Sequence, residues 1–82
     1  MNNSKKNKNL YLDRLNKIIG IRIMNRRSIL QISRAELAEE IGITQQQLAK
    51  YESGVNRIPV GRLVLACDIL SSSISYFVSN KF

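Results

Sequence analysis

Residues 33–54, SRAELAEEIGITQQQLAKYESG, decide the fold of this chain. Ser33 and Glu36 have the spacing of a capping box, in which the serine caps a new helix and the glutamate reaches back to the serine backbone. Three apolar residues then fall on one side of that helix: Leu37, Ala38 and Ile41. Gly42 follows, at the position that favours glycine after a helix. These features predict a short helix over residues 34–41.

A second capping box begins two residues later, at Thr44 and Gln47. It predicts another short helix over residues 45–52, which ends at Ser53 and Gly54. Two short helices joined by a glycine-containing turn form a helix-turn-helix unit. The pattern is specific because caps, apolar positions and stop residues all agree, whereas a lone glycine between helices would be weak support.

Three further helices are expected around this unit. Residues 13–30 have helical apolar spacing, and Gly20 within them either permits close packing or marks a kink. Pro59 favours a helix start before residues 60–70, and Ser73 can cap a last short helix. The apolar positions of these segments are Leu12, Leu15, Ile19 and Ile23; Leu63, Ala66, Cys67 and Leu70; and Ile74, Phe77 and Val78. The sequence therefore predicts an all-α fold, a compact bundle of about five helices.

The length and charge of the chain set further bounds. Its 82 residues allow one domain, in which residues 1–10 are expected to be a disordered basic tail and residues 11–79 the folded part. Thirteen basic residues against six acidic ones give a net charge of +7. This balance suits a polyanion, with nucleic acid first and an anionic membrane surface second. No sensor domain is apparent, so regulation is expected to come from abundance, a partner or proteolysis.

Several classes of function find no support in the residue content. The chain has no histidine and a single cysteine, Cys67, so neither a histidine metal site nor an internal disulfide is expected. With no apparent catalytic base, nucleophile pair or metal cluster, we expect no enzymatic activity, no cofactor and no small-molecule ligand. No apolar run approaches the roughly 18 residues of a membrane span, and no signal-peptide core follows the N-terminus. A cytoplasmic protein without membrane association is expected.

The predicted helix over residues 45–52 has one core side and one polar side. At about 100° per residue, Leu48 and Tyr51 project toward the core, and Glu52 lies nearer to that side. The outward side is polar or small: Gln45, Gln46, Ala49, Lys50 and Ser53. It carries no acid, as close approach to phosphates requires.

This outward side has the chemistry to contact bases. Glutamine can pair bidentately with adenine in the major groove, and lysine can donate to guanine. Residues at the N-terminal end of a recognition helix lie deepest in the groove, and a small side chain admits contact with a thymine methyl. The predicted base-contacting residues are therefore Gln45, Gln46, Ala49 and Lys50. We assign Gln47 instead to the reciprocal cap of Thr44.

Three residues around this surface are candidates for phosphate contact. Arg34 lies at the first position of the helix over residues 34–41, where free amide groups already favour an anion. Thr44 and Arg57 flank the same surface. For each arginine, the alternative is a solvated side chain. Phosphate contacts would hold the register on DNA, whereas base contacts would specify the sequence.

At these residues the sequence resembles the Cro/repressor family of helix-turn-helix domains, which includes regulators of the xenobiotic-response-element type. The resemblance extends from about residue 19 to residue 78. It is carried by IGIRI (19–23), Arg27, the stretch over 33–54, RIPVGRL (57–63) and SISYFV (73–78). It implies a lambda-repressor-like bundle of five helices and dimeric binding to a palindromic operator.

The resemblance also implies roles for individual residues. By position, it places Gln45, Gln46 and Lys50 at base edges, and it places four residues near phosphates: Arg34, Thr44, Asn56 and Arg57. It pairs Arg27 on the first helix with Glu52 at the end of the third, as a structural ion pair.

Three residues depart from the family pattern. Arg34 replaces the usual glutamine, which implies a stronger but less specific contact. Gly61 replaces an acid near the start of the fourth helix, so a ragged start is expected there. Cys67 replaces a small apolar residue, and a buried cysteine behaves as a small hydrophobe, so we place it in the core rather than assign it a redox role.

The sequence thus predicts a sequence-specific DNA-binding transcriptional regulator. We expect a repressor that reads the major groove of a palindromic operator with residues 45–52. Its expected partners are double-stranded DNA and a second copy of the chain, which would meet at the apolar residues left over near the C-terminus: Tyr76, Val78 and Phe82. The alternative is an antitoxin or adaptor that uses the same fold to bind a protein. A protein-binding module of this kind should have an apolar or acidic outward surface over residues 45–52.

Overall fold

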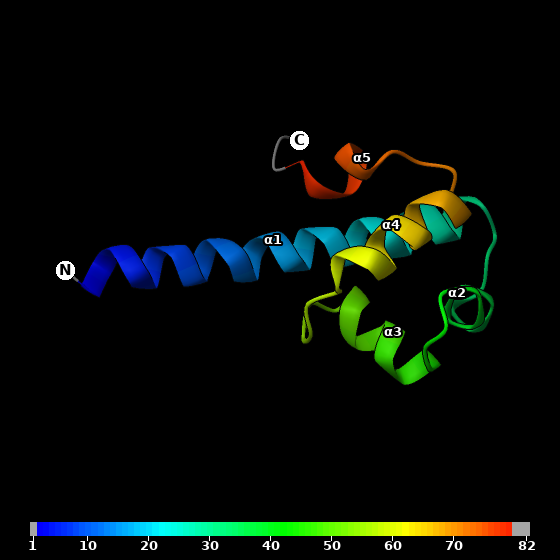
Figure 1. Ribbon diagram of the computed structural model, residues 1–82, viewed down its shortest axis with the longest axis horizontal. Helices are drawn as coiled ribbons and strands as arrows, with labels where there is room; N and C mark the ends of the chain where they lie inside the picture. Colours follow the sequence, from blue (N-terminus) through cyan, green and yellow to red (C-terminus); the bar gives the residue numbers. More distant parts are fainter. Residues whose placement is uncertain (1, 80–82) are drawn as a thin grey trace.

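The computed structural model describes residues 2–79, with side chains from residue 8 onward. All regular secondary structure within these residues is helical (Figure 1): α1 (Asn2–Ile29), α2 (Arg34–Glu40), α3 (Gln45–Glu52), α4 (Val60–Ile69) and α5 (Ile74–Val78). The prediction of an all-α fold is therefore confirmed. Phe82, which we expected at a contact surface, lies outside the described residues.

The caps of α2 are those that the sequence predicts. Ser33 Oγ accepts a hydrogen bond from the Glu36 N–H at 3.0 Å, and Glu36 Oε1 accepts one from the Ser33 N–H at 2.8 Å. Hydrogen bonding from Ser33 to the carboxyl, foremost from its backbone N–H and to a smaller extent from its side chain, lowers the pKa of Glu36 because it favours the charged form. Gly42 follows the helix with a φ of +73°, a conformation that glycine adopts without steric cost.

Helix α1 is longer than the sequence predicts. We expected a helix from Asp13 and a disordered segment before it, but α1 begins at Asn2 and extends past the rest of the bundle (Figure 1). Leu12, expected in the core, is exposed together with Leu10. Packing begins at Leu15, and the earlier turns continue a helix that is already nucleated, which costs less than starting one. The division of the chain at residue 10 stays a prediction.

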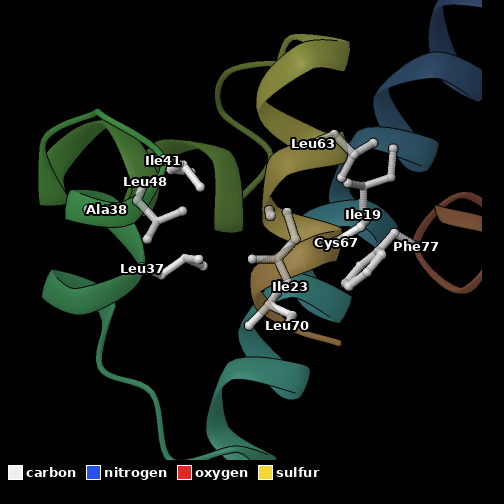
Figure 2. Packing of buried hydrophobic residues seen from close by; sticks show 11 residues of the cluster. Ile19, Ile23, Leu37, Ala38, Ile41, Leu48, Leu63, Cys67, Leu70 and Phe77 are labelled. Carbon is white, nitrogen blue, oxygen red and sulfur yellow. The ribbon is translucent and has the colours of Figure 1, made fainter. Parts of the chain in front are cut away.

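The core lies where α1, α4 and α5 meet the helix-turn-helix unit (Figure 2). On one side are residues of α2, α3 and the turn between them, and on the other are residues of α1, α4 and α5. The buried members are Ile19, Ile23, Leu37, Ala38, Ile41, Leu48, Leu63, Ala66, Cys67, Leu70 and Phe77. This apolar contact fixes α3 against the bundle by one face, so its other face is left toward solvent.

The last two helices differ from expectation in detail. Gly61 does not disturb the start of α4, since the Leu63 N–H donates to the Pro59 carbonyl at 3.0 Å. Ser73 precedes α5 but gives no side-chain cap, because its Oγ lies 2.9 Å from Ser75 Oγ instead. Ile74, expected in the core, is exposed, as is Val78; the five residues of α5 make little more than one turn, and only Phe77 points fully inward.

Cys67, another departure from the family pattern, lies in the core as expected. Burial raises the pKa of its thiol, with a smaller contribution from the negative charge of Asp68. A neutral thiol in an apolar setting is unreactive, which fits a packing role.

Three arginines donate hydrogen bonds to carbonyls at the C-terminal ends of other helices. Sequence analysis predicted none of these contacts. Arg26 Nε donates to the Leu70 carbonyl at 2.9 Å, at the end of α4. Arg62 Nη1 donates to the Ile41 carbonyl at 2.6 Å, at the end of α2. Arg22, which is buried, donates to the carbonyls of Tyr76 and Ser79 at the end of α5. Cations at helix C-termini satisfy the last carbonyls and oppose the helix dipole.

Candidate nucleic-acid interface

The outward face of α3 carries the residues that the sequence assigned to base contact. The helix begins at Gln45, because Thr44 caps it: Thr44 Oγ1 accepts from the Gln47 N–H at 3.0 Å. Leu48 is fully buried on the opposite face, which fixes the rotation of the helix. The side chains on the outward face are exposed or, for alanine, half-buried: Gln45, Gln46, Ala49 and Lys50. The four residues that the sequence assigned to base contact therefore lie together on one face of α3.

The second capping box is incomplete. Gln47 does not reach back to Thr44; its Nε2 donates to Asn56 Oδ1 at 3.1 Å. The assignment of Gln47 to a reciprocal cap is therefore wrong, because the loop after α3 returns beside the first turn and offers a carbonyl acceptor. Asn56 is held in this way next to α3, and its own Nδ2 donates to the Val55 carbonyl at 3.2 Å.

The C-terminal end of α3 is tied to α1 by an ion pair. Arg27 Nε donates to Glu52 Oε2 at 2.8 Å, and Arg27 Nη2 donates to Glu52 Oε1 at 3.1 Å. The side chains of Arg27 and Glu52 are only 11% and 2% exposed. A bidentate arginine–carboxylate pair fixes both partners in direction as well as distance. The position of α3 relative to α1 is therefore set by a directional contact, in addition to the core.

Arg34 joins the same carboxylate, which sequence analysis did not foresee. Its Nε donates to Glu52 Oε1 at 3.0 Å, and its side chain is 41% exposed. The residue at the start of α2 is thus bound to the residue at the end of α3. The helical projection of Glu52 toward the core was the available signal, but it did not identify a second cation.

Arg57 is positioned only loosely. Its Nη2 lies 3.8 Å from Asp13 Oδ1 on α1, and both side chains are mostly exposed. Ion pairs of this kind at a surface contribute little free energy, about 0–1 kcal/mol. Arg57 can therefore exchange this partner for another anion at small cost.

Two glycines let α1 approach the end of α3. A β-carbon on Gly20 would lie 2.7 Å from the carbonyl carbon of Glu52, and closer still to carbonyl oxygens of α3. Gly54 has a φ of +79°, and a β-carbon there would lie 2.6 Å from Lys17 Cγ. Of the two roles that the sequence allowed for Gly20, close packing is therefore the one that it has.

Neither a membrane-spanning helix nor a metal-binding cluster occurs in the part of the chain that the structure describes. No helix there is both long and apolar enough to pass through a bilayer. Within the same residues, no cluster of three or more histidine, cysteine, aspartate or glutamate side chains is placed to hold a metal ion.

Comparisons with known proteins place the chain in a family. A family model described as helix-turn-helix matches residues 23–77. An uncharacterised HTH-type transcriptional regulator of Rickettsia conorii is 46% identical over 70 residues, which cover 85% of this chain and 56% of that protein. An uncharacterised HTH-type transcriptional regulator of Sinorhizobium medicae is 44% identical over 59 residues, which cover 72% of this chain and 42% of that protein.

Structural similarity agrees with this assignment. The crystal structure of the clp gene regulator ClgR from C. glutamicum has a TM-score of 0.72 at 22% identity, over 77% of this chain and 82% of that one. At this identity the likeness shows the shared fold. The chain spans about half the length of the curated relatives that it matches. Because the family model covers more than half of the chain, the chain belongs to the Cro/C1-type helix-turn-helix family.

Proposed function

We propose that this chain binds double-stranded DNA in a sequence-specific manner and acts as a transcriptional repressor. The observation that carries the proposal is the outward face of α3, where Gln45, Gln46 and Lys50 are exposed and no acid lies among them. In this proposal α3 enters the major groove, with the two glutamines and Lys50 at base edges and Ala49 against a thymine methyl.

Phosphate contacts on both sides of α3 would hold it in the groove. Arg34 stands at the start of α2, Thr44 at the start of α3, and Asn56 and Arg57 follow α3. The exposed guanidinium of Arg57 is held only weakly by Asp13, so it is available to a phosphate. Such contacts give affinity that falls as salt rises, because counterions are released from the DNA.

Replacement of Gln45 or Gln46 by alanine tests the base-reading assignment. Each variant should lose about 1–3 kcal/mol of affinity for the preferred operator and keep nearly all of its affinity for scrambled DNA. The operator is first obtained by selection from a random DNA pool, and both affinities are then measured by titration. Asn25→Ala is the matched control, because Asn25 is an exposed amide on α1. Equal losses on operator and scrambled DNA would rule out base reading by these glutamines.

We also propose that the active species is a homodimer on a palindromic operator. One recognition helix covers only a few base pairs, whereas two half-sites about 34 Å apart double the sequence information. Support comes from α5, where three apolar side chains are exposed: Ile74, Tyr76 and Val78. Such a group on a small domain is typical of a contact surface.

Charged substitutions on α5 test the dimer and its location separately. Val78→Asp should leave the domain folded, because Val78 is exposed, and should shift the complex with a palindromic operator from two chains to one in sedimentation experiments. Val64→Asp, at an exposed position on α4, is the control and should keep two chains per operator. A single wild-type chain per palindrome at saturating protein would exclude the dimer. A Val78→Asp variant that still binds as two chains would exclude only this location.

A further inference from the structure

Two arginines share one buried carboxylate at the base of the recognition helix. Arg27 Nη2 and Arg34 Nε both donate to Glu52 Oε1, at 3.1 and 3.0 Å. Among the described residues, no second acid pairs with either arginine. The two arginines and the single carboxylate therefore have a net charge of +1. This charge lies between the first residue of α2 and the last residue of α3.

The two arginines use their donors differently. Arg27 is largely buried, and all three of its guanidinium nitrogens donate hydrogen bonds. Nε and Nη2 donate to Glu52, and Nη1 donates to the Ile32 carbonyl at 3.1 Å. Arg34 donates to the described residues only through Nε, and 41% of its side chain is exposed. Both Nη groups of Arg34, with four N–H donors, are thus left for a ligand outside the chain.

We propose, on the basis of the DNA-binding function proposed above, that Arg34 is a positioning residue that holds Glu52 and a DNA phosphate at the same time. The planar guanidinium can donate from Nε to the carboxylate and from its Nη groups to a phosphate, because these donors point along different edges of one rigid group. Phosphate binding and the placement of α3 are then coupled through a single side chain. Glu52 orients the guanidinium before DNA arrives.

Two simpler roles make different predictions. If Arg34 were only a point charge near DNA, a lysine would serve as well. If Arg34 left Glu52 in order to bind DNA, loss of the Glu52 charge would release it and strengthen binding. The bridging role predicts weaker DNA binding in both cases, because lysine has a single donor nitrogen and because Glu52 is needed to aim the guanidinium.

The Arg34→Lys substitution is the main test. It keeps the charge and leaves the Arg27–Glu52 pair in place, so the domain should fold, which circular dichroism would check. We expect affinity for operator and scrambled DNA to fall alike, by about tenfold, since one charge-assisted hydrogen bond is lost. The slope of log affinity against log salt should fall by about 0.9, one phosphate contact, because the lysine stays on Glu52. Arg14→Lys, at an exposed arginine on α1 without an ion pair among the described residues, is the control and should match wild type.

A second pair of variants tests the coupling. In a Glu52→Gln background, assayed at a temperature where circular dichroism shows the fold intact, Arg34→Lys should cause less than a twofold further loss of affinity. Wild-type affinity and salt slope in Arg34→Lys would overturn the inference, as would stronger DNA binding by Glu52→Gln. If the wild-type chain bound no DNA from the random pool, the proposed function would fail instead, so the two failures are distinguishable.

Discussion

Replacement of Glu52 by glutamine should lower the free energy of unfolding by about 3–5 kcal/mol, the cost of leaving a buried charge without its partner. Glu52 is 2% exposed and Arg27 11%, so solvent cannot replace the lost interaction at Arg27. For a domain of this size, each kcal/mol lowers the midpoint of thermal unfolding by about 4–8 °C. The loss should therefore be evident in a thermal melt followed by circular dichroism.

The arrangement of the cluster predicts an order among its variants. Arg27→Met leaves the Glu52 carboxylate with Arg34 as a partner, whereas Glu52→Gln leaves two arginines without a carboxylate. Glu52→Gln should therefore be the more destabilising of the two. Glu39→Gln, at an exposed position on α2, is the control and should melt as wild type does. Unaltered melting of both Glu52→Gln and Arg27→Met would mean that the cluster does not stabilise the fold.

The parts of the fold that depend on local chemistry were predictable from the sequence. Capping side chains and stop residues act on their own neighbours in the chain, so they indicate where a helix begins and ends. The predicted helix over residues 45–52 has the observed bounds, and the one predicted over residues 34–41 ends one residue beyond the observed α2. The outward face of α3 followed from the same bounds, since helical geometry fixes which residues oppose Leu48. The exposure of Gln45 and Gln46 was therefore a consequence of local rules.

The parts that depend on contacts distant in sequence were not predictable in this way. Arg22 falls three residues after Ile19, on the apolar side of α1, and this spacing was a signal that it would be buried. Its partners, however, are carbonyls more than fifty residues away, which no local pattern identifies. The same holds for the contact between Arg34 and Glu52. The resemblance to a family gave the Arg27–Glu52 pair, but the usual residue at position 34 is not an arginine.

Some backbone conformations also could not be predicted from the sequence. Gly42 follows α2 with a positive φ, as glycine after a helix predicts. Gln31 and Ser71 adopt the same region after α1 and α4, with φ values of 58° and 52°. In both, the next N–H reaches back to a helical carbonyl: Ile32 to Arg27 at 2.9 Å, and Ser72 to Cys67 at 3.1 Å. These bonds offset the cost of a left-handed residue that is not glycine, and they exist only once the helix has formed.

Replacement of Gly20 by alanine should destabilise the domain, although helix propensity alone predicts the opposite. Alanine in a helix interior is favoured over glycine by about 1 kcal/mol. At this position, however, the added methyl group would lie 2.7 Å from the carbonyl carbon of Glu52, and the neighbouring atoms are backbone, which cannot move aside as a flexible side chain could. Helices α1 and α3 would have to separate, and overpacking of this kind costs typically about 1–3 kcal/mol.

The same change should also weaken operator binding, since α3 moves relative to α1 and to the arginines that hold its end. Gly61→Ala is the matched control: apart from the chain neighbours of Gly61 and the nearby backbone of α4, no heavy atom lies within 4 Å of a β-carbon at Gly61, and its φ is not positive. That variant should gain up to about 1 kcal/mol of stability from helix propensity. Urea unfolding of the two variants would give free energies of opposite sign relative to wild type. A Gly20→Ala protein as stable as Gly61→Ala would mean that α1 and α3 do not depend on this close approach.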